Sequence, residues 1–164
     1  MKSVLISIQP RWCELIASGK KTVEVRKTVP KLKPPFKCYI YCTHSKNGIA
    51  YCKGNDILNG KVMGEFVCNT MYYLIQAGAG ICIAEEYKPF DEIELDWFRT
   101  ASCLSDQEVC DYLNGKDGYA WSISDLVIYD EPKPLREFNH CGVNYHFNPP
   151  ITRPPQSWCY VEGK

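Results

Sequence analysis

The sequence has no apolar run approaching the roughly 18–20 residues that cross a bilayer. Its first stretch, MKSVLISIQPRW, is also too short in apolar residues for the hydrophobic region of a signal peptide. We therefore expect a cytoplasmic protein that does not associate with a membrane.

No Cys-x-x-Cys motif occurs, although the chain has 10 cysteines. Many of them stand where a strand would bury an apolar side chain, as in CYIYC and EFVCN, and free cysteine behaves as a small buried hydrophobe. We expect reduced thiols and no metal site. Two groups of residues have side chains that can bind zinc, but their spacing differs from that of known zinc sites, so each is a weak signal. They are Cys38, Cys42 and Cys52, and His140, Cys141 and His146.

The net charge is zero, which argues against tight, non-specific DNA binding driven by counterion release. This balance hides an asymmetry, because residues 1–64 carry 12 Lys and Arg against 3 Asp and Glu, whereas residues 65–164 carry 7 against 16. Either the first half forms a positive face that attracts phosphate, or the two halves neutralise each other on folding.

The hydrophobic pattern has no internal repeat and predicts more strand than helix. A short helix is expected at about residues 10–18, with Gly19 as its stop, and a second after Ser105, whose capping-box pattern includes Glu108. Strands are expected at 3–8, 22–26, 38–43, 61–75 (with Gly64 as a bulge), 119–130 and 156–162; residues 76–103 have no clear pattern. This order favours a mostly β, α+β fold: a small, mixed or mainly antiparallel barrel with at least two short helices.

LISIQPRWCELIASGKKTVEVRK resembles the opening of an ASCH domain of the PUA-like superfamily. GKVMGEFVC, YAWSISDLVIYDEPKPLREF and ITRPPQSWCYV resemble later strands of that family in the same order, the last as it occurs in phage and bacterial members. The resemblance implies one domain over residues 1–164, a PUA-like barrel, and a cleft between the first helix and the barrel. It also implies RNA or a modified nucleoside as the ligand.

Some small members of this family are amidohydrolases that remove the acetyl group of N4-acetylcytidine, and one branch is described as a metal-dependent ribonuclease. The resemblance maps the amidohydrolase lysine to Lys21 and its glutamate to Glu65. Glu24 stands in place of the threonine nucleophile, which leaves open whether the cleft is an enzyme. No cofactor is expected, apart from a divalent metal ion if the cleft is a ribonuclease.

We expect Lys21, Glu24 and Glu65 to carry any catalysis, with Lys21 as base or anion anchor and as the partner of Glu65. Glu24 and Arg26 share one face of a strand and form either a surface pair or a contact to a base and a phosphate. The remaining expected ligand contacts are Lys20, Thr22, Arg26, Trp121, Gln156, Ser157 and Trp158; Trp12 is a weaker aromatic candidate, and all the tryptophans have a core role as the alternative.

Three hypotheses follow. The first is a cleft that binds RNA or a modified nucleoside, and the second is a hydrolase of the same cleft. The third is a protein-interaction module of transcription regulation that uses the basic loop at 27–37. The oligomeric state stays open.

Overall fold

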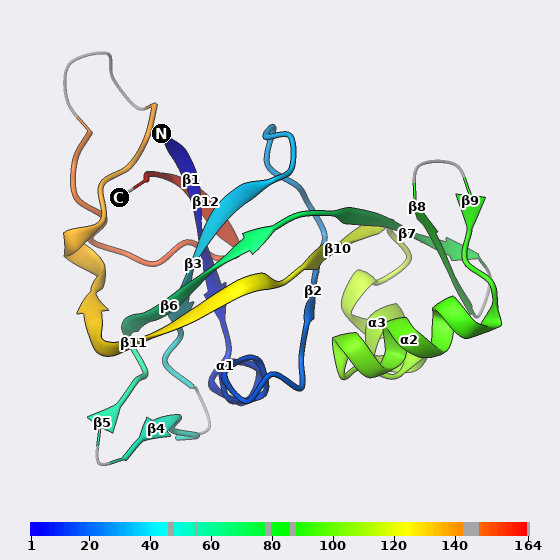
Figure 1. Cartoon of the computed structure of the whole chain (residues 1–164), viewed down its shortest axis with the longest axis horizontal. Coiled ribbons are helices and arrows are strands. Elements are labelled where there is room, and N and C mark those ends of the chain that lie inside the picture. Colours follow the sequence, from blue (N-terminus) through cyan, green and yellow to red (C-terminus); the bar gives the residue numbers. More distant parts are fainter. Residues whose placement is uncertain (46–47, 55, 78–79, 86–87, 143–147, 164) are drawn as a thin grey trace.

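The computed structural model describes residues 1–45, 48–54, 56–77, 80–85, 88–142 and 148–163, with the side chains of 76–88 left out. Figure 1 shows two crossed sheets, with α1 below one of them and α2 and α3 together beside the other. The elements are β1 (Lys2–Ile8), α1 (Pro10–Ala17), β2 (Val23–Arg26), β3 (Phe36–Cys42), β4 (Cys52–Lys53), β5 (Asp56–Ile57), β6 (Lys61–Cys68), β7 (Met71–Ala77), β8 (Gly80–Glu85), β9 (Lys88–Pro89), α2 (Glu92–Ser102), α3 (Asp106–Leu113), β10 (Gly118–Ser122), β11 (Ser124–Pro134), the short 3-10 turn η1 (Leu135–Glu137) and β12 (Trp158–Glu162).

Sheet A has the strand order β11-β6-β3-β1-β12, and sheet B has the order β2-β10-β7-β8-β9. All described strand pairs are antiparallel except β1 with β3, which are joined by the crossover through α1 and β2. This agrees with the predicted mixed, mainly antiparallel, strand-rich class.

The sheets do not close into the barrel that the sequence suggested. One two-stranded ribbon runs through both sheets, because β6 continues into β7 and β11 follows β10 after a break of one residue (Figure 1). On the side of β2, however, a side-chain hydrogen bond from Arg26 to the Ser7 carbonyl joins the two sheets, and no strand ladder is described there. The barrel prediction is therefore wrong in its closure, and this open side holds the cavity described below.

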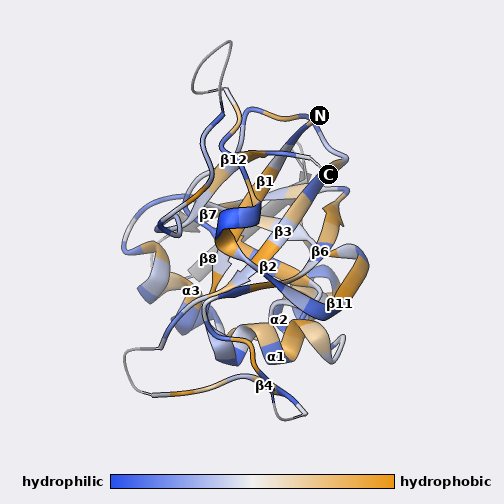
Figure 2. Cartoon of the chain, turned by 90° about the vertical axis from the view of Figure 1, so that its left-hand side faces the viewer, coloured by the Kyte–Doolittle hydropathy of each residue, from blue (hydrophilic) through white to orange (hydrophobic). Residues whose placement is uncertain are grey.

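Three apolar clusters surround the sheets. The largest lies between sheets A and B and under α1, and includes Ile6, Ile40, Phe66 and Trp121. The second fixes α2 and α3 on the outer face of sheet B, and the third covers the other face of sheet A. Figure 2 shows hydrophobic segments along the central strands, as expected for a sheet that is covered on both faces.

Both predicted helices are confirmed, as α1 and α3. Pro10 opens α1 in its first turn, and Gly19 follows the helix with a φ of +73°. Ser105 caps α3 through a reciprocal capping box with Glu108. Helix α2 was not predicted, although Asp91 and Glu94 form a capping box there as well.

Two predicted strands are each divided in two. The expected strand at 61–75 breaks after Cys68 into β6 and β7, and the one at 119–130 breaks at Ile123 into β10 and β11. The bend is local: Asp125 has a φ of 48°, in the left-handed region. The bulge expected at Gly64 is confirmed, because the register of β6 against both β3 and β11 shifts next to this residue.

The described cysteines are free, and Cys13, Cys38, Cys42 and Cys68 are buried as the sequence predicts. Burial raises the pKa of the Cys38 thiol well above its usual value. Of the second group of ligand types, His146 lies outside the described residues. None of the helices in the described ranges has the length and apolar character needed to span a bilayer.

Candidate functional site

The stretch GKKTVEVR reaches the open side of the two sheets from the end of α1. The backbone N–H groups of Lys20 and Lys21 both donate to the Leu15 carbonyl, which turns the chain sharply out of the helix. In the strand that follows, Val23 and Val25 face α2 and α3, so alternation turns Glu24 and Arg26 toward sheet A.

Lys21, Glu24 and Arg26 form a buried charge cluster. The Glu24 Oε2 atom lies 3.4 Å from the Lys21 ammonium, and its Oε1 atom lies 3.2 Å from the Arg26 guanidinium. The three residues are 2%, 4% and 9% exposed, so solvent screens these charges little.

Backbone carbonyls hold both cations in place. Lys21 Nζ donates to the Ser102 carbonyl at 2.6 Å, and the second terminal nitrogen of Arg26 donates to the Ser7 carbonyl at 2.6 Å. Two polar atoms of the cluster, Glu24 Oε2 and Arg26 Nε, are buried without a hydrogen-bond partner among the described residues. The cluster therefore contains one buried acceptor and one buried donor whose hydrogen-bonding capacity is not used.

These groups line a cavity of about 570 Å³, within the range of small-molecule sites. Its walls come from the ends of β1 and β3, from α1, from β2, from the α2–α3 junction, from α3 and from the loop before β12. The lining residues are Ser7, Gln9, Trp12, Lys21, Glu24, Val25, Arg26, Thr43, Leu104, Glu108, Tyr112, Pro154, Pro155 and Gln156.

Charged and aromatic side chains meet on the cavity wall. Arg11 bridges α1 to Glu108 of α3 at 3.2 Å and also lies over the Trp12 ring at 3.9 Å from its centroid. Hydrogen bonds from Ser105 and Arg11 hold the pKa of Glu108 below its usual value. Lys27 lies over the ring of Tyr112, 5.1 Å from the centroid, so a second cation is close to this wall.

The structure brings together four of the predicted site residues: Lys21, Glu24, Arg26 and Gln156. The neighbouring Lys20 and Thr22 are exposed and are absent from the lining. Trp121 and Trp158 were the stronger aromatic candidates from the sequence, but Trp12 is the tryptophan among the residues that line the cavity.

Trp121 and Trp158 have structural roles. Trp121 is fully buried and makes an edge contact with Phe36, so its ring is not free to stack on a ligand. Trp158 donates its indole N–H to the hydroxyl of Thr28 at 3.0 Å. Ser157, another expected contact, is not on the lining; its carbonyl accepts from the backbone N–H of Ser7.

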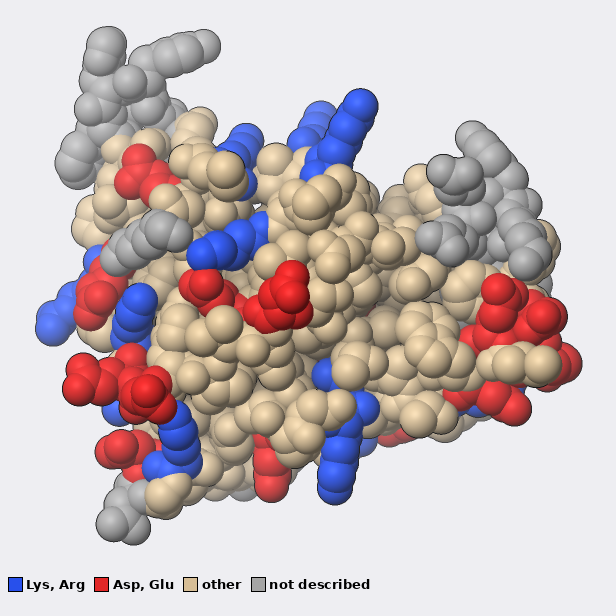
Figure 3. Space-filling view, viewed as in Figure 1, with Lys and Arg blue, Asp and Glu red and all other residues tan. Residues whose placement is uncertain are grey.

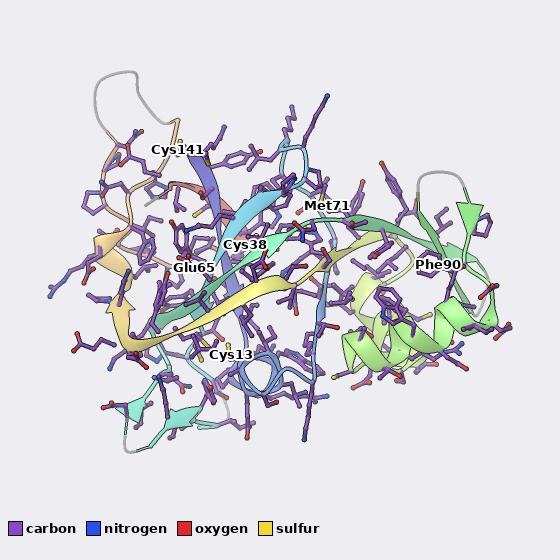
Figure 4. All side chains as sticks on the ribbon, viewed as in Figure 1. Cys13, Cys38, Glu65, Met71, Phe90 and Cys141 are labelled. Atoms are coloured by element: carbon purple, nitrogen blue, oxygen red, sulfur yellow. The ribbon has the colours of Figure 1, made fainter. Side chains whose placement is uncertain are left out.

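Glu65 does not pair with Lys21, contrary to the expectation from the sequence. Its carboxylate accepts from Lys37 at 2.7 Å and from the Tyr129 hydroxyl at 2.6 Å (Figure 4 labels Glu65). It lies opposite Tyr39 in the register of β3 and β6, and Tyr39 belongs to the cluster on the other face of sheet A. Strand alternation on β6 thus turns Glu65 away from the cavity.

Several cavity residues had no signal in the sequence. Ser7, Leu104, Glu108 and Tyr112 come from separate elements, and Glu108 was recognised only as a helix-capping residue. Their convergence depends on how α3 packs against β2, which local patterns do not encode. Among the described residues no group of three Cys, His, Asp or Glu side chains could hold a metal ion.

The strand-rich α+β fold described above also occurs in proteins of known structure. Three solved structures of the ASCH protein from Zymomonas mobilis (ZmASCH) have this fold. The unsubstituted protein matches with 22% identity and a TM-score of 0.60 over 98% of this chain and 87% of that chain. Two single-residue variants, each at 21% identity, match with TM-scores of 0.60 and 0.59 over 99% and 98% of this chain and 91% and 88% of theirs.

No family model and no curated protein matches the sequence. The predicted resemblance to ASCH proteins is confirmed at the level of the fold, by structural similarity to ZmASCH over nearly the whole chain.

Proposed function

We propose that the cavity binds one nucleoside of an RNA, plain or modified, and that Glu24 and Arg26 contact the edge of its base. The observation that carries this proposal is the cluster of Lys21, Glu24 and Arg26 on the wall of a cavity of about 570 Å³, in which Glu24 Oε2 and Arg26 Nε have no hydrogen-bond partner among the described residues. A nucleobase edge presents an N–H donor next to an oxygen or nitrogen acceptor, which complements a carboxylate oxygen next to a guanidinium N–H.

The walls suit the rest of a nucleoside. Trp12 and Tyr112 offer aromatic faces, which bind unpaired bases by stacking. Lys21 and Arg26 together carry one more charge than Glu24 neutralises, and Lys27 adds another cation next to Tyr112. This surplus of positive charge favours a ligand that brings a phosphate to the cavity mouth.

The test is calorimetric titration with ribonucleosides and their 5′-monophosphates, with N4-acetylcytidine included. Glu24→Gln keeps the shape of the side chain, but it removes the negative charge and replaces one of the two acceptor oxygens by an NH2 donor. Because a hydrogen bond to a charged group contributes about 1.5–3 kcal/mol, we expect binding to weaken roughly 10- to 150-fold.

Glu65→Gln is the matched control, because it makes the same chemical change on the other face of sheet A. Its affinity should stay within about twofold of the unsubstituted protein. Equal affinities for Glu24→Gln and the unsubstituted chain would show that this carboxylate does not contact the ligand.

A hydrolase of the same cavity is the second candidate. It is favoured by one feature: Glu24 stands where the resemblance places the threonine nucleophile, and its Oε2 atom is paired with the Lys21 ammonium at 3.4 Å. A carboxylate so placed can take a proton from water that attacks an acyl group, while the ammonium stabilises the developing negative charge.

Chromatography of N4-acetylcytidine and of single-stranded RNA after incubation, with and without divalent metal ions, tests this second candidate. Product that disappears in Glu24→Gln but not in Glu65→Gln supports a hydrolase. No product in any condition excludes hydrolysis of these substrates and leaves binding as the function.

A further inference from the structure

The face of sheet B that carries the charge cluster continues beyond the cavity. Arg26 on β2 lies opposite Tyr119 on β10, and Tyr119 lies opposite Tyr73 on β7. Directly opposite residues of antiparallel strands point to the same face. A row of side chains therefore leads from the cavity across three adjacent strands.

The far part of this face is open to solvent. At one end, Trp121 and Met71 pack into the core between the two sheets. Farther along β7, sheet A no longer covers the face, and Tyr73 and Ile75 are 49% and 45% exposed. The ring of Tyr73 contacts that of the half-buried Tyr119, with centroids 5.4 Å apart and planes inclined by 53°. We call Tyr73, Ile75 and Tyr119 the tyrosine platform.

A basic loop follows β2 directly and borders this face. Lys31 and Lys33 are exposed on it, and the sequence KTVPKLKPP at 27–35 contains no acidic residue. Figure 3 shows basic side chains projecting from this loop next to an uncharged surface over β7 and β10.

Two contacts with β12 fix the loop. The backbone N–H of Lys31 donates to the Tyr160 hydroxyl at 2.6 Å, and the Trp158 indole donates to Thr28. The lysines therefore project from a loop that is anchored to sheet A.

We propose that the tyrosine platform binds the nucleotides of a single-stranded RNA that flank the nucleoside in the cavity. Exposed aromatic rings bind successive bases by stacking, whereas lysines next to them attract the phosphates. Tyr119 and Tyr73 stand on neighbouring strands, which lie about 4.8 Å apart, so two aromatic rings are available side by side for two bases. This inference rests on the proposed function, since the cavity provides the starting point of the strand.

A protein partner fits this surface less well. The exposed lysines of the neighbouring loop favour a ligand with regularly spaced negative charge, and a phosphate backbone supplies one such charge per nucleotide. A duplex fits the tyrosines less well than a single strand, because its bases are already stacked on each other and present only their edges.

The test compares binding of one nucleoside with binding of a strand. Fluorescence anisotropy measures the affinity for a fluorescein-labelled, mixed-sequence RNA octamer, for its duplex and for the DNA octamer of the same sequence. Calorimetry measures the tightest-binding ribonucleoside 5′-monophosphate. The variants are Tyr73→Ala with Tyr119→Ala, and Tyr73→Phe with Tyr119→Phe.

We expect the alanine pair to weaken binding of the RNA octamer by at least about fivefold and up to roughly 150-fold, without changing binding of the monophosphate. The phenylalanine pair keeps the ring faces and should retain the octamer affinity. Trp97→Ala is the matched control, because Trp97 is 43% exposed and contacts Tyr72 on the helix side of the same sheet. Figure 4 labels Phe90 on that side. The control should bind the octamer like the unsubstituted chain.

Each other outcome has a definite meaning. Octamer binding that ignores the alanine pair overturns the platform, and the proposed function stands if Glu24→Gln still weakens monophosphate binding. Octamer binding that depends on the tyrosines but not on Glu24 keeps the platform and overturns the cavity. A third outcome is self-association: the average molecular mass in solution rises with protein concentration in the unsubstituted chain but not in Tyr73→Ala, while octamer binding is unchanged. This outcome would overturn the platform and assign the face to a second copy of the chain.

Discussion

The substitution Glu24→Gln tests whether the charge cluster is truly buried and coupled. The carboxylate lies 3.2 and 3.4 Å from two cationic groups, and at an effective dielectric constant of 20 each such pair attracts by about 5 kcal/mol before desolvation is subtracted. Removing one member of a buried ion pair costs about 3–5 kcal/mol, because the remaining charges lose their compensation. For a chain of 164 residues we expect the melting temperature to fall by roughly 6–20 °C.

Thermal unfolding followed by circular dichroism measures this loss, and chemical denaturation converts it into a free energy of unfolding. Adding Lys21→Met to Glu24→Gln removes one of the two uncompensated cations. The double variant should therefore lose less stability than the sum of the two single variants, by more than about 0.5 kcal/mol. Additive losses, or a loss below about 1 kcal/mol for Glu24→Gln, would refute the coupled cluster.

Two further predictions concern β6. Burial would raise the pKa of Glu65, but hydrogen bonds from Lys37 and Tyr129 hold it below its usual value. This stabilisation is present above the unfolded pKa, near 4.3, and is lost as the pH falls through the lower folded pKa. At pH 7 the free energy of unfolding of the unsubstituted chain should exceed that of Glu65→Gln by about 1–2 kcal/mol. Melting curves from pH 7 to pH 3 should show this difference in stability disappearing below about pH 4. A difference that stays constant down to pH 3 contradicts this role of Glu65. Gly64→Ala should lower stability by about 1–3 kcal/mol in denaturant melts, because its Cβ would collide with the backbone carbonyl of Val127 on β11; unchanged stability would mean that the bulge can relax.

Local patterns predicted much of this molecule. Pro10, Gly19 and the Ser105–Glu108 capping box located the ends of two helices, because such signals act within one turn of chain. Alternation in TVEVR separated the valines from Glu24 and Arg26 for a similar reason. Alternation does not predict whether the face that carries Glu24 and Arg26 is exposed to solvent or packs against another sheet.

By itself, the sequence determined the types of the elements in 3–26, 36–43, 61–75 and 105–130, the buried thiols and the resemblance that singled out Lys21, since each follows from short-range spacing or from residues in a fixed order. Only the tertiary structure decided which side chains share a cavity. It placed Ser7, Trp12, Glu108 and Tyr112 around the charge cluster and turned Glu65 toward Lys37 on the other face of sheet A. These outcomes depend on strand register and helix packing between residues as far apart as β1 and the loop before β12, and no local pattern carries that information.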